Sequence, residues 1–472
     1  MLFNELNLPE EILRAVEDMG FSEATEIQSK AIPVMLEGKD LVGKSNTGTG
    51  KTAAFGIPAA VSVTRGGKNG VEVLILCPTR ELAMQACKEI EKFSAYMPWV
   101  KPCAVYGGAA MDKQISELRR GANIVVGTPG RVMDHIGRKT LKLENLRTIV
   151  LDEADEMLNM GFREDIETIL SFVPKERQTV LFSATMPPPI MAITKEYQND
   201  PVVIKVESKA RTVDTIEQKY FEVPMGRKTD ALKLLLIAYE PKLSMVFCNT
   251  KKMVDELTEA LVSKGFKAAG LHGDMKQASR TQVLSAFKSG SINVLIATDV
   301  AARGIDVEGV DCVFNYDLPQ DNEYYIHRIG RTGRAGKSGA AYTIISGRKQ
   351  FYELKNIASF IKADIARAEL PGRDEIVARK AAHVNEKILS AVESGKYESC
   401  RADVQKLMES GLSAEDIAVA LLGMRLSKDT KNIPEIISVP RDNGGKGGRY
   451  RARSRFHDRH KDKRSENNHQ AL

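Results

Sequence analysis

The sequence lacks the features that mark secreted and membrane-spanning proteins. No apolar run approaches the roughly 20 residues that a membrane helix needs. The first residues, Met1 to Glu5, contain no basic segment followed by an apolar core. The six cysteines are scattered and include no CxxC pair. We therefore expect a soluble, cytoplasmic protein with reduced thiols, no zinc site and no membrane contact.

Residues 1–440 also lack net charge. They hold 58 basic and 58 acidic side chains, whereas residues 441–472 hold ten Lys or Arg and four Asp or Glu, so this tail carries the whole excess of +6. The tail is rich in Gly, Arg, Asn and Ser, with isolated Tyr450 and Phe456. We expect it to be disordered and to bind the phosphates and bases of a nucleic acid. A tail that only improves solubility is the alternative.

A chain of 472 residues suggests about three domains. Apolar runs alternate with amphipathic helical stretches in two successive regions, as in buried parallel sheets with covering helices. We therefore predict an α/β fold with two tandem parallel-sheet lobes. The predicted strands are Val71–Cys77, Ile124–Val126, Thr148–Leu151 and Thr179–Phe182 in the first lobe, and Met245–Cys248, Ala268–Leu271, Val294–Ala297, Cys312–Asn315 and Ala341–Ile345 in the second.

The composition also predicts where the parts of the chain meet. Residues from about 203 to 214 are polar without a clear period, as expected of a linker. After residue 366, three amphipathic segments follow one another, with Gly395 and Gly411 between them. They would barely bury a core alone, so we expect them to pack on the second lobe or on another copy of the chain. The predicted parts are lobe 1 (1–205), the linker (206–214), lobe 2 (215–365), a helical region (366–440) and the disordered basic tail (441–472).

A glycine-punctuated run predicts a phosphate-binding loop between a strand and a helix. Backbone N–H groups that turn inward at a helix N-terminus bind a polyphosphate. Lys51 would then reach the outer phosphates, and the Thr52 hydroxyl would ligate the accompanying magnesium. A Gly/Thr-rich surface turn is the alternative. The residues of this run are Ser45, Asn46, Thr47, Gly48, Thr49, Gly50, Lys51 and Thr52.

The pair Asp152-Glu153 ends a predicted strand 101 residues after Lys51, where the second half of an NTPase site belongs. Asp152 would hold the magnesium through its water shell, and Glu153 would polarise the attacking water. An acidic helix N-terminus is the alternative. Upstream, the amide of Gln28 carries the donor and the acceptor that reading an adenine edge requires, although a Gln at a helix start more often only caps the helix.

The second lobe has no phosphate loop but carries the run His327–Arg334. Three arginines within seven residues, separated by glycines, suit a trinegative phosphate. A solvated basic turn is the alternative. A lobe with such a cluster and no nucleotide loop of its own indicates a shared site, in which the arginines neutralise transition-state charge only when the lobes close.

These motifs, in this order, resemble those of DEAD-box ATP-dependent RNA helicases of the bacterial cold-shock type. The resemblance covers about residues 3–346 and implies two RecA-like lobes. Its motifs are Phe3 with Gly20-Phe21 and Gln28, the phosphate loop, Pro78–Ala83, Gly107-Gly108, Thr128–Arg131, Asp152–Asp155, Ser183–Thr185, Val246–Thr250, Gln277 with Arg280, Arg303–Asp306 and His327–Arg334.

The resemblance also implies roles for single residues. It implies that Phe3 stacks on adenine, that Gln28 reads the adenine edge and that Asp306 contacts the ribose of ATP. Arg331 and Arg334 become arginine fingers, and Asp155 meets His327 when the lobes close. The residues that it places along the RNA backbone are Thr79, Arg80, Gly108, Thr128, Gly130, Arg131, Arg280, Thr298, Arg303 and Gly304.

The chain departs from the family pattern at two positions. Ala24 stands where the family usually has Pro, and Ser45 where it usually has Ala; we expect both to modulate nucleotide affinity. The helical region is similar to the dimerisation module of these relatives, which suggests a homodimer. The RNA-recognition fold that some relatives carry is missing, and the basic tail stands in its place.

Two functions fit these residues. The first is an enzyme that unwinds short RNA duplexes and remodels RNA or RNA–protein complexes, with hydrolysis of ATP resetting the open state. The alternative is an ATP-gated RNA clamp or annealing chaperone with little unwinding, and a DNA translocase ranks below both. Ribosome-assembly or RNA-decay proteins are candidate partners.

Overall fold

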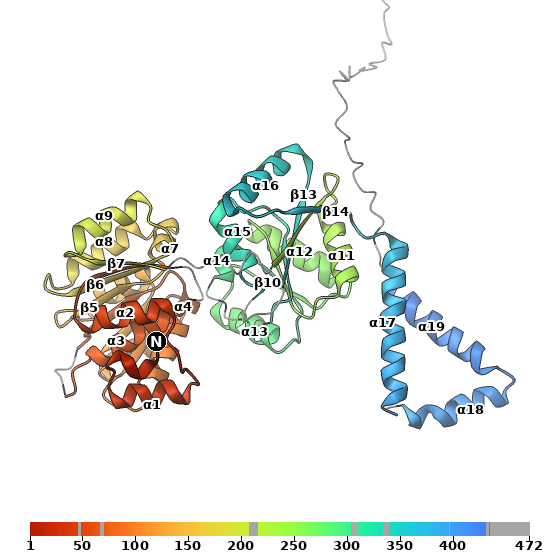
Figure 1. Cartoon of the computed structure of the whole chain (residues 1–472), viewed down its shortest axis with the longest axis horizontal. Coiled ribbons are helices and arrows are strands. Elements are labelled where there is room, and N and C mark those ends of the chain that lie inside the picture. Colours follow the sequence, from red (N-terminus) through yellow and green to blue (C-terminus); the bar gives the residue numbers. More distant parts are fainter. Residues whose placement is uncertain are drawn as a thin grey trace, which may run out of the picture. The chain divides into compact units, whose positions relative to one another are not determined.

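A computed structural model describes residues 1–45, 49–66, 70–206, 216–303, 305, 307, 309–333, 339–395, 397–430 and 434 of the chain. The described residues form two sheets of seven strands each, followed by a helical region (Figure 1). The strand order is β3-β4-β2-β5-β6-β1-β7 in the first sheet and β10-β11-β9-β12-β13-β8-β14 in the second. The predicted α/β fold with two parallel-sheet lobes is therefore confirmed.

The first sheet consists of β1 (Leu41–Lys44), β2 (Val73–Leu76), β3 (Pro102–Val105), β4 (Ile124–Gly127), β5 (Thr148–Leu151), β6 (Gln178–Ser183) and β7 (Val202–Lys205). Its helices are the short 3-10 helix η1 (Phe3–Leu6), α1 (Glu10–Asp18), α2 (Glu26–Leu36), α3 (Lys51–Ser62), α4 (Arg80–Phe93), α5 (Met111–Arg119), α6 (Pro129–Gly137), α7 (Ala154–Asn159), α8 (Arg163–Phe172) and α9 (Pro188–Tyr197).

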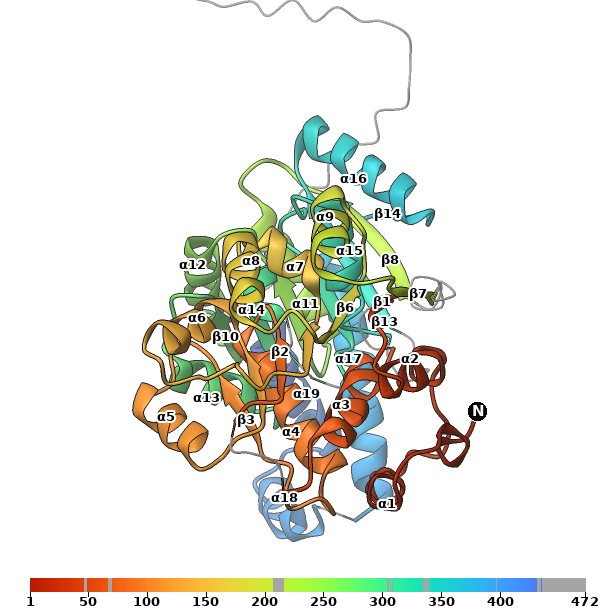
Figure 2. The ribbon, with the colours of Figure 1, turned by 90° about the vertical axis from the view of Figure 1, so that its left-hand side faces the viewer.

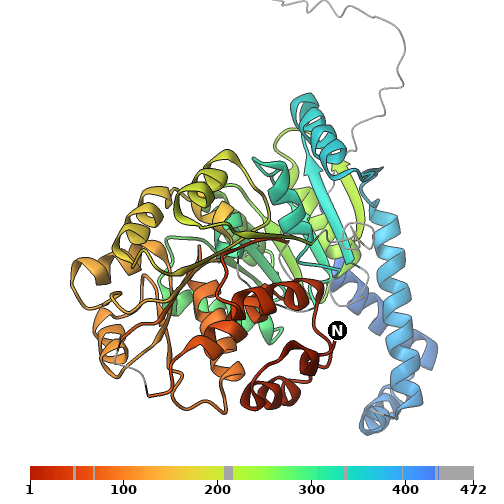
Figure 3. The same ribbon diagram turned by 60° about the vertical axis from the view of Figure 1, so that its left-hand side comes forward.

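Each face of the first sheet has its own hydrophobic core. Every residue of β2, β4 and β5 is buried, as expected for parallel strands covered on both faces. Phe55 of α3 and Phe93 of α4 pack on one face, whereas Met157 of α7 and Ile169 of α8 pack on the other. Figures 2 and 3 show the corresponding helices on opposite sides of the sheet.

The second sheet consists of β8 (Ile216–Glu222), β9 (Ser244–Phe247), β10 (Ala268–Leu271), β11 (Val294–Ala297), β12 (Cys312–Asn315), β13 (Gly339–Ile345) and β14 (Ala366–Ala368). Its helices are α11 (Lys228–Tyr239), α12 (Lys251–Val262), α13 (Gln277–Lys288), α14 (Asp299–Ala302), α15 (Asn322–Ile329) and α16 (Gly347–Ile361).

The helical region contains α17 (Arg373–Glu393), the 3-10 helix η2 (Glu398–Cys400), α18 (Arg401–Glu409) and α19 (Ala414–Thr430), in agreement with the three predicted segments. Ile376 at the start of α17 packs on Leu234 of α11, and Lys380 pairs with Glu240 at 2.7 Å. Ile417 of α19 is also buried, whereas many of the other apolar side chains of this region are exposed. They include Ile388, Leu389, Val392, Leu407, Met408, Leu412, Val419, Leu421 and Met424.

Several sequence predictions of local structure were wrong. Residues 203–205 belong to β7 rather than to a linker, and β14 lies where only helix was expected. The strands β3 and β8 were missed, because β3 begins with a proline and β8 is interrupted by Glu217, Gln218 and Lys219 instead of forming an apolar run. The apolar residues Leu6, Leu8, Ile12 and Val16 follow a helical spacing, but the structure separates η1 from α1 because Asn7 adopts a left-handed conformation.

Candidate nucleotide-binding and RNA-binding site

The predicted phosphate loop joins β1 to α3, which begins at Lys51 and Thr52. Gly50 has φ +91°, and a Cβ atom there would lie 2.4 Å from Nε2 of Gln28, so this position requires glycine. Buried Ser45 donates its backbone N–H to the carbonyl of Ser183 over 3.1 Å. Asn46, Thr47 and Gly48 lie outside the described residues.

Gln28 ties the start of α2 to the phosphate loop. Its Oε1 accepts the backbone N–H of Thr25 at 2.9 Å, and its Nε2 donates to the carbonyl of Gly50 at 3.1 Å. Gln28 therefore caps α2, as the alternative interpretation predicts. One N–H and one lone pair of its side-chain amide remain for a ligand. Phe3 is buried in the core of the first lobe. Recognition of adenine by both residues stays a prediction.

Lys51 and Asp152 are two buried groups of opposite charge, only 7% and 6% exposed. Among the described residues, neither Nζ of Lys51 nor Oδ1 of Asp152 has a hydrogen-bond partner. Burial raises the pKa of Asp152 to about 7, and the Lys51 charge opposes this rise. An anionic phosphate and its divalent cation would satisfy these two atoms, so the residues fit ATP with magnesium.

Glu153 and Asp155 follow the end of β5, and Thr185 follows the end of the neighbouring strand β6. Glu153 has φ 51° and ψ 51°, a left-handed conformation that is costly for a residue with a side chain and is often found at functional sites. Asp155 Oδ2 accepts the backbone N–H and the hydroxyl of Thr185 at 2.8 and 2.9 Å. Ser183 in turn donates its hydroxyl to the carbonyl of Thr185 at 2.6 Å.

Residues from both lobes line one small cavity of about 20 Å³. Lys51, Glu153 and Asp155 come from the first lobe, whereas His327 and Arg331 come from the second. Burial lowers the pKa of His327, although Glu153 acts in the opposite direction, so we expect a neutral imidazole. Arg331 donates from Nη1 to the carbonyl of Ile305 at 3.2 Å. Two further predicted residues, Arg334 and Asp306, lie outside the described residues.

Arg328, the first arginine of the predicted cluster, points into the second lobe instead. It is 1% exposed, and its Nε and Nη2 donate to the two carboxylate oxygens of Asp299 at 2.6 and 2.7 Å. It also donates to Asn249 Oδ1 at 2.9 Å and lies over the ring of Phe247. Arg328 therefore ties its own motif to α14 and to the motif Val246–Thr250 of the same lobe, a role that arginine spacing alone did not reveal.

Most of the residues predicted along the RNA backbone cluster at helix starts. Thr79, Thr128 and Thr298 are the N-cap residues of α4, α6 and α14. Gly108 has φ +85°, and a Cβ there would lie 2.3 Å from Nη1 of Arg80, so the glycine leaves room for that arginine. Gly130 and Arg131 belong to the first turn of α6. Gly304 lies outside the described residues.

Two of the predicted RNA-binding arginines contact acidic residues of the first lobe. Arg280 is bonded to Glu81 of α4, and Arg303 to Glu156 of α7. The guanidinium of Arg303 also lies over the ring of Tyr324, and its Nη2 has no partner among the described residues. Sequence reasoning missed both acidic partners, because nothing in the chain marks a pair that far apart.

Comparison with known proteins identifies the family. The DEAD/DEAH box helicase family matches residues 25–193, and the helicase conserved C-terminal domain matches residues 227–336. The chain is 48% identical over 446 residues to the ATP-dependent RNA helicase CshA of Listeria monocytogenes, covering 94% of this chain and 85% of that protein. The chain belongs to the DEAD-box family of ATP-dependent RNA helicases. It is therefore an enzyme, an RNA helicase that depends on ATP.

Other relatives of this DEAD-box helicase support the same assignment. A DEAD-box ATP-dependent RNA helicase CshA of Geobacillus kaustophilus is 47% identical and covers 91% of both chains. The structure of Saccharomyces cerevisiae Dbp5 bound to RNA and ADP BeF3 is 32% identical with a TM-score of 0.72, covering 79% of this chain and 97% of that one. Residues 371–436 match the RNA helicase DeaD dimerization domain. In the described part of the helicase, no helix has the length and apolarity to cross a membrane.

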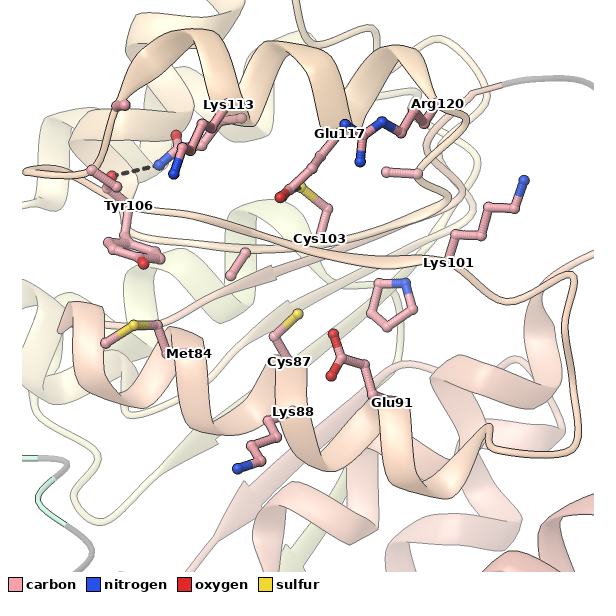
Figure 4. A pocket seen from close by; sticks show the side chains of 16 residues that line it. Met84, Cys87, Lys88, Glu91, Lys101, Cys103, Tyr106, Lys113, Glu117 and Arg120 are labelled. Atoms are coloured by element: carbon pink, nitrogen blue, oxygen red, sulfur yellow. Dashed lines mark hydrogen bonds between the residues drawn. The ribbon is translucent and has the colours of Figure 1, made fainter.

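A larger cavity lies apart from the small cavity that Lys51, Glu153 and His327 line. It measures about 570 Å³ and is lined by α4, β3 and α5 (Figure 4). Cys87 and Cys103 line it, and burial raises the pKa of Cys87 to about 12. Five of the six cysteines are buried, as expected for core residues, and all six are free. Buried thiols with raised pKa values are poor nucleophiles, which gives this cavity no thiol chemistry.

Proposed function

We propose that this helicase separates short RNA duplexes and remodels RNA structures or RNA–protein complexes by local strand destabilisation. ATP binding closes the two lobes on RNA, and hydrolysis resets the open state. The observation that carries the proposal is the cavity shared by Lys51 and Glu153 of the first lobe with His327 and Arg331 of the second. A site divided in this way acts only when the lobes meet, which couples catalysis to their closure.

Each group in the site has a proposed chemical task. Lys51 and the phosphate loop bind the outer phosphates, and Glu153 orients and deprotonates the attacking water. Thr52 and Asp152 would hold a magnesium ion, which would supply positive charge beside the phosphates. Arg331 and Arg334 neutralise the charge that develops in the transition state, while His327 links the second lobe to Asp155. Nζ of Lys51 and Oδ1 of Asp152 are buried without a hydrogen-bond partner in the part of the chain that the structure describes, which supports this assignment.

The proposed ligand contacts beyond the phosphates follow the family resemblance. Phe3, Gln28 and Asp306 recognise the adenosine of ATP. The RNA backbone lies against Thr79, Arg80, Gly108, Thr128, Gly130, Arg131, Arg280, Thr298, Arg303 and Gly304. The position of several of these residues at helix starts supports phosphate binding there, since a helix N-terminus attracts anions.

We also propose a homodimer formed by the helical region. The match to the RNA helicase DeaD dimerization domain and the exposed apolar side chains of α17, α18 and α19 support it.

The domain bounds predicted above are kept, except that β14 extends the second lobe to Ala368. The cytoplasmic location and the partners in ribosome assembly or RNA decay are kept as proposals too, and buried free thiols agree with a reducing compartment.

Two assays on the same sample test the proposed unwinding. ATP hydrolysis should rise severalfold or more when single-stranded RNA is added, and a short RNA duplex should be released only when ATP is present. RNA-stimulated hydrolysis without duplex release would instead support the ATP-gated clamp or annealing chaperone. Release that proceeds equally well without any nucleotide contradicts the coupling of strand separation to ATP.

A further inference from the structure

Gln114 of α5 is a buried amide with three partners on other segments. It is 3% exposed. Its Nε2 donates to the carbonyl of Tyr106 at 3.0 Å, and its Oε1 lies 3.2 Å from Nη1 of Arg131 and 3.0 Å from Nε2 of His135. Tyr106 follows β3, whereas Arg131 and His135 belong to α6. One side chain therefore joins α5, α6 and the loop after β3.

The protonation pattern of this cluster follows from the donors and acceptors. Arg131 can only donate, so Oε1 of Gln114 faces it and the amide nitrogen faces the carbonyl of Tyr106. The second lone pair of Oε1 accepts from Nε2 of His135, which must carry the proton. Nδ1 of His135 then carries no proton and lies 2.8 Å from the hydroxyl of Thr140, which also lies 3.2 Å from the backbone carbonyl of His135 and has one hydrogen to donate. Both lone pairs of the Gln114 oxygen are thus in use.

The same cluster holds both ends of the glycine pair Gly107-Gly108. Gln114 binds the carbonyl of Tyr106, just before the pair, and Arg131 binds the carbonyl of Ala109, just after it, at 3.2 Å. Arg131 donates from the same Nη1 to Gln114. The guanidinium is therefore fixed relative to the turn. Because Arg80 packs directly over Gly108, a shift of the turn also moves Arg80.

We propose that Gln114 is a positioning residue for RNA binding, which locks the Gly107-Gly108 turn and Arg131 into one rigid unit. The proposal rests on the RNA contacts proposed above for Gly108 and Arg131. Preorganised donors bind a phosphate backbone more tightly because the ordering cost is met before binding. A buried amide that merely stabilises the first lobe is the competing explanation, and it predicts loss of stability without a specific loss of RNA affinity.

The experiment compares Gln114→Leu with a matched variant, Gln178→Leu, in the full-length protein. Gln178 is also buried in the first lobe, and its Nε2 donates to the carbonyls of Met35 and Lys39 at 2.9 and 2.7 Å, away from the proposed RNA residues. We expect Gln114→Leu to raise the RNA concentration that half-saturates the ATPase about tenfold, with kcat at saturating RNA nearly kept. Gln178→Leu should lower Tm similarly but leave the RNA requirement within about twofold.

A second variant covers the case in which Gln114→Leu does not fold. Gln114→Glu keeps acceptors for Arg131 and His135 but turns an oxygen toward the carbonyl of Tyr106, and its charge competes with phosphate for Arg131. It should also raise the RNA requirement severalfold. An unchanged RNA requirement in every folded Gln114 variant overturns the proposal, and so does an equal rise in Gln178→Leu.

A double-mutant cycle with Arg131→Ala separates this proposal from the proposed RNA site itself. If Gln114 acts through Arg131, Gln114→Leu should change the RNA requirement much less in the Arg131→Ala background. Fully additive effects would contradict the positioning role. If Arg131→Ala alone leaves RNA binding unchanged, the assignment of Arg131 to the RNA site fails, and the positioning role fails with it.

Discussion

Arg280 of the second lobe donates from Nε and Nη2 to one carboxylate oxygen of Glu81 in the first lobe, at 2.9 and 2.7 Å. The two side chains are only 7% and 8% exposed. Arg280 also donates to the carbonyl of His272 at 3.2 Å, so its guanidinium is anchored in its own lobe. The pair therefore connects the lobes through α4, the helix that begins with the proposed RNA contact Arg80.

Neutralising Glu81 should weaken the closed state selectively. Glu81→Gln leaves Arg280 buried without its counter-charge when the lobes meet, whereas in separated lobes the arginine is hydrated, so the cost falls on closure. We expect RNA-stimulated kcat/KM to fall about tenfold or more. Glu91→Gln changes an exposed glutamate of the same helix and is the control. Equal activity of Glu81→Gln and wild type in RNA-stimulated ATP hydrolysis would rule out this role.

The exposed apolar side chains of the helical region predict a dimer that charged substitutions should disrupt. Leu389 and Val392 of α17 are 64% and 74% exposed. Introducing Asp at both positions places charge in the proposed interface and should convert the protein to a monomer in sedimentation experiments at micromolar concentration. Val262→Asp, at an exposed apolar position of the second lobe, should leave the dimer intact. If the wild-type protein is already monomeric in this experiment, and deleting residues 371–430 does not change its sedimentation, the proposed interface is refuted.

The basic tail, which lies outside the described residues, is expected to add salt-dependent RNA affinity. Each phosphate that it neutralises adds roughly 0.7 to the slope of log affinity against log salt for a single strand. Deleting 441–472 should flatten this slope by a few units and hardly change the ATPase rate at saturating RNA. Alanine at both Tyr450 and Phe456 should lower affinity without altering the slope. An unchanged slope after truncation would leave the tail a solubilising or protein-binding role.

His135 predicts a pH dependence of stability. Burial and, next, the charge of Arg131 lower its pKa, with Arg138 acting in the same direction and Asp134 in the opposite one. A lowered folded-state pKa means that the stabilisation is complete above the unfolded value of about 6.5 and is lost as the pH falls through the folded value. The Tm advantage of wild type over His135→Gln should therefore shrink from about pH 8 to about pH 5.5. A constant difference would show that His135 does not titrate in this way.

The fold could be predicted from the sequence to a greater extent than the contacts between side chains of the two lobes. Strands such as β2 and β5 consist of Val, Ile and Leu, apart from Thr148 at the start of β5, and are buried throughout, so their pattern was sufficient to predict them. The strand β8 alternates Ile216, Gln218 and Tyr220 with charged residues and gave no such run. The partners of Arg280 and Arg303 were missed for a different reason. These pairs depend on how two lobes meet, and no local period or propensity encodes it.

Some residues of the site could be predicted from the sequence, and others could not. The phosphate loop and Asp152-Glu153 could be predicted, because glycines and adjacent carboxylates at strand ends have a direct chemical reading. Gln114 could not, because a lone glutamine on an amphipathic helix looks like a surface residue until its three partners are known. The spacing of the arginines indicated a cluster but not that Arg328 turns inward to Asp299.

The most direct test of an RNA-dependent ATPase with a shared site is ATP turnover by Glu153→Gln at saturating RNA, with Lys51→Ala as the reference for lost nucleotide binding. Only the water-orienting group is removed from Glu153, so the variant should still bind ATP and RNA while hydrolysis slows by about 100-fold or more. Lys51→Ala should fail to bind ATP. Turnover by Glu153→Gln near the wild-type rate would contradict the assignment of the catalytic base and the mechanism built on it.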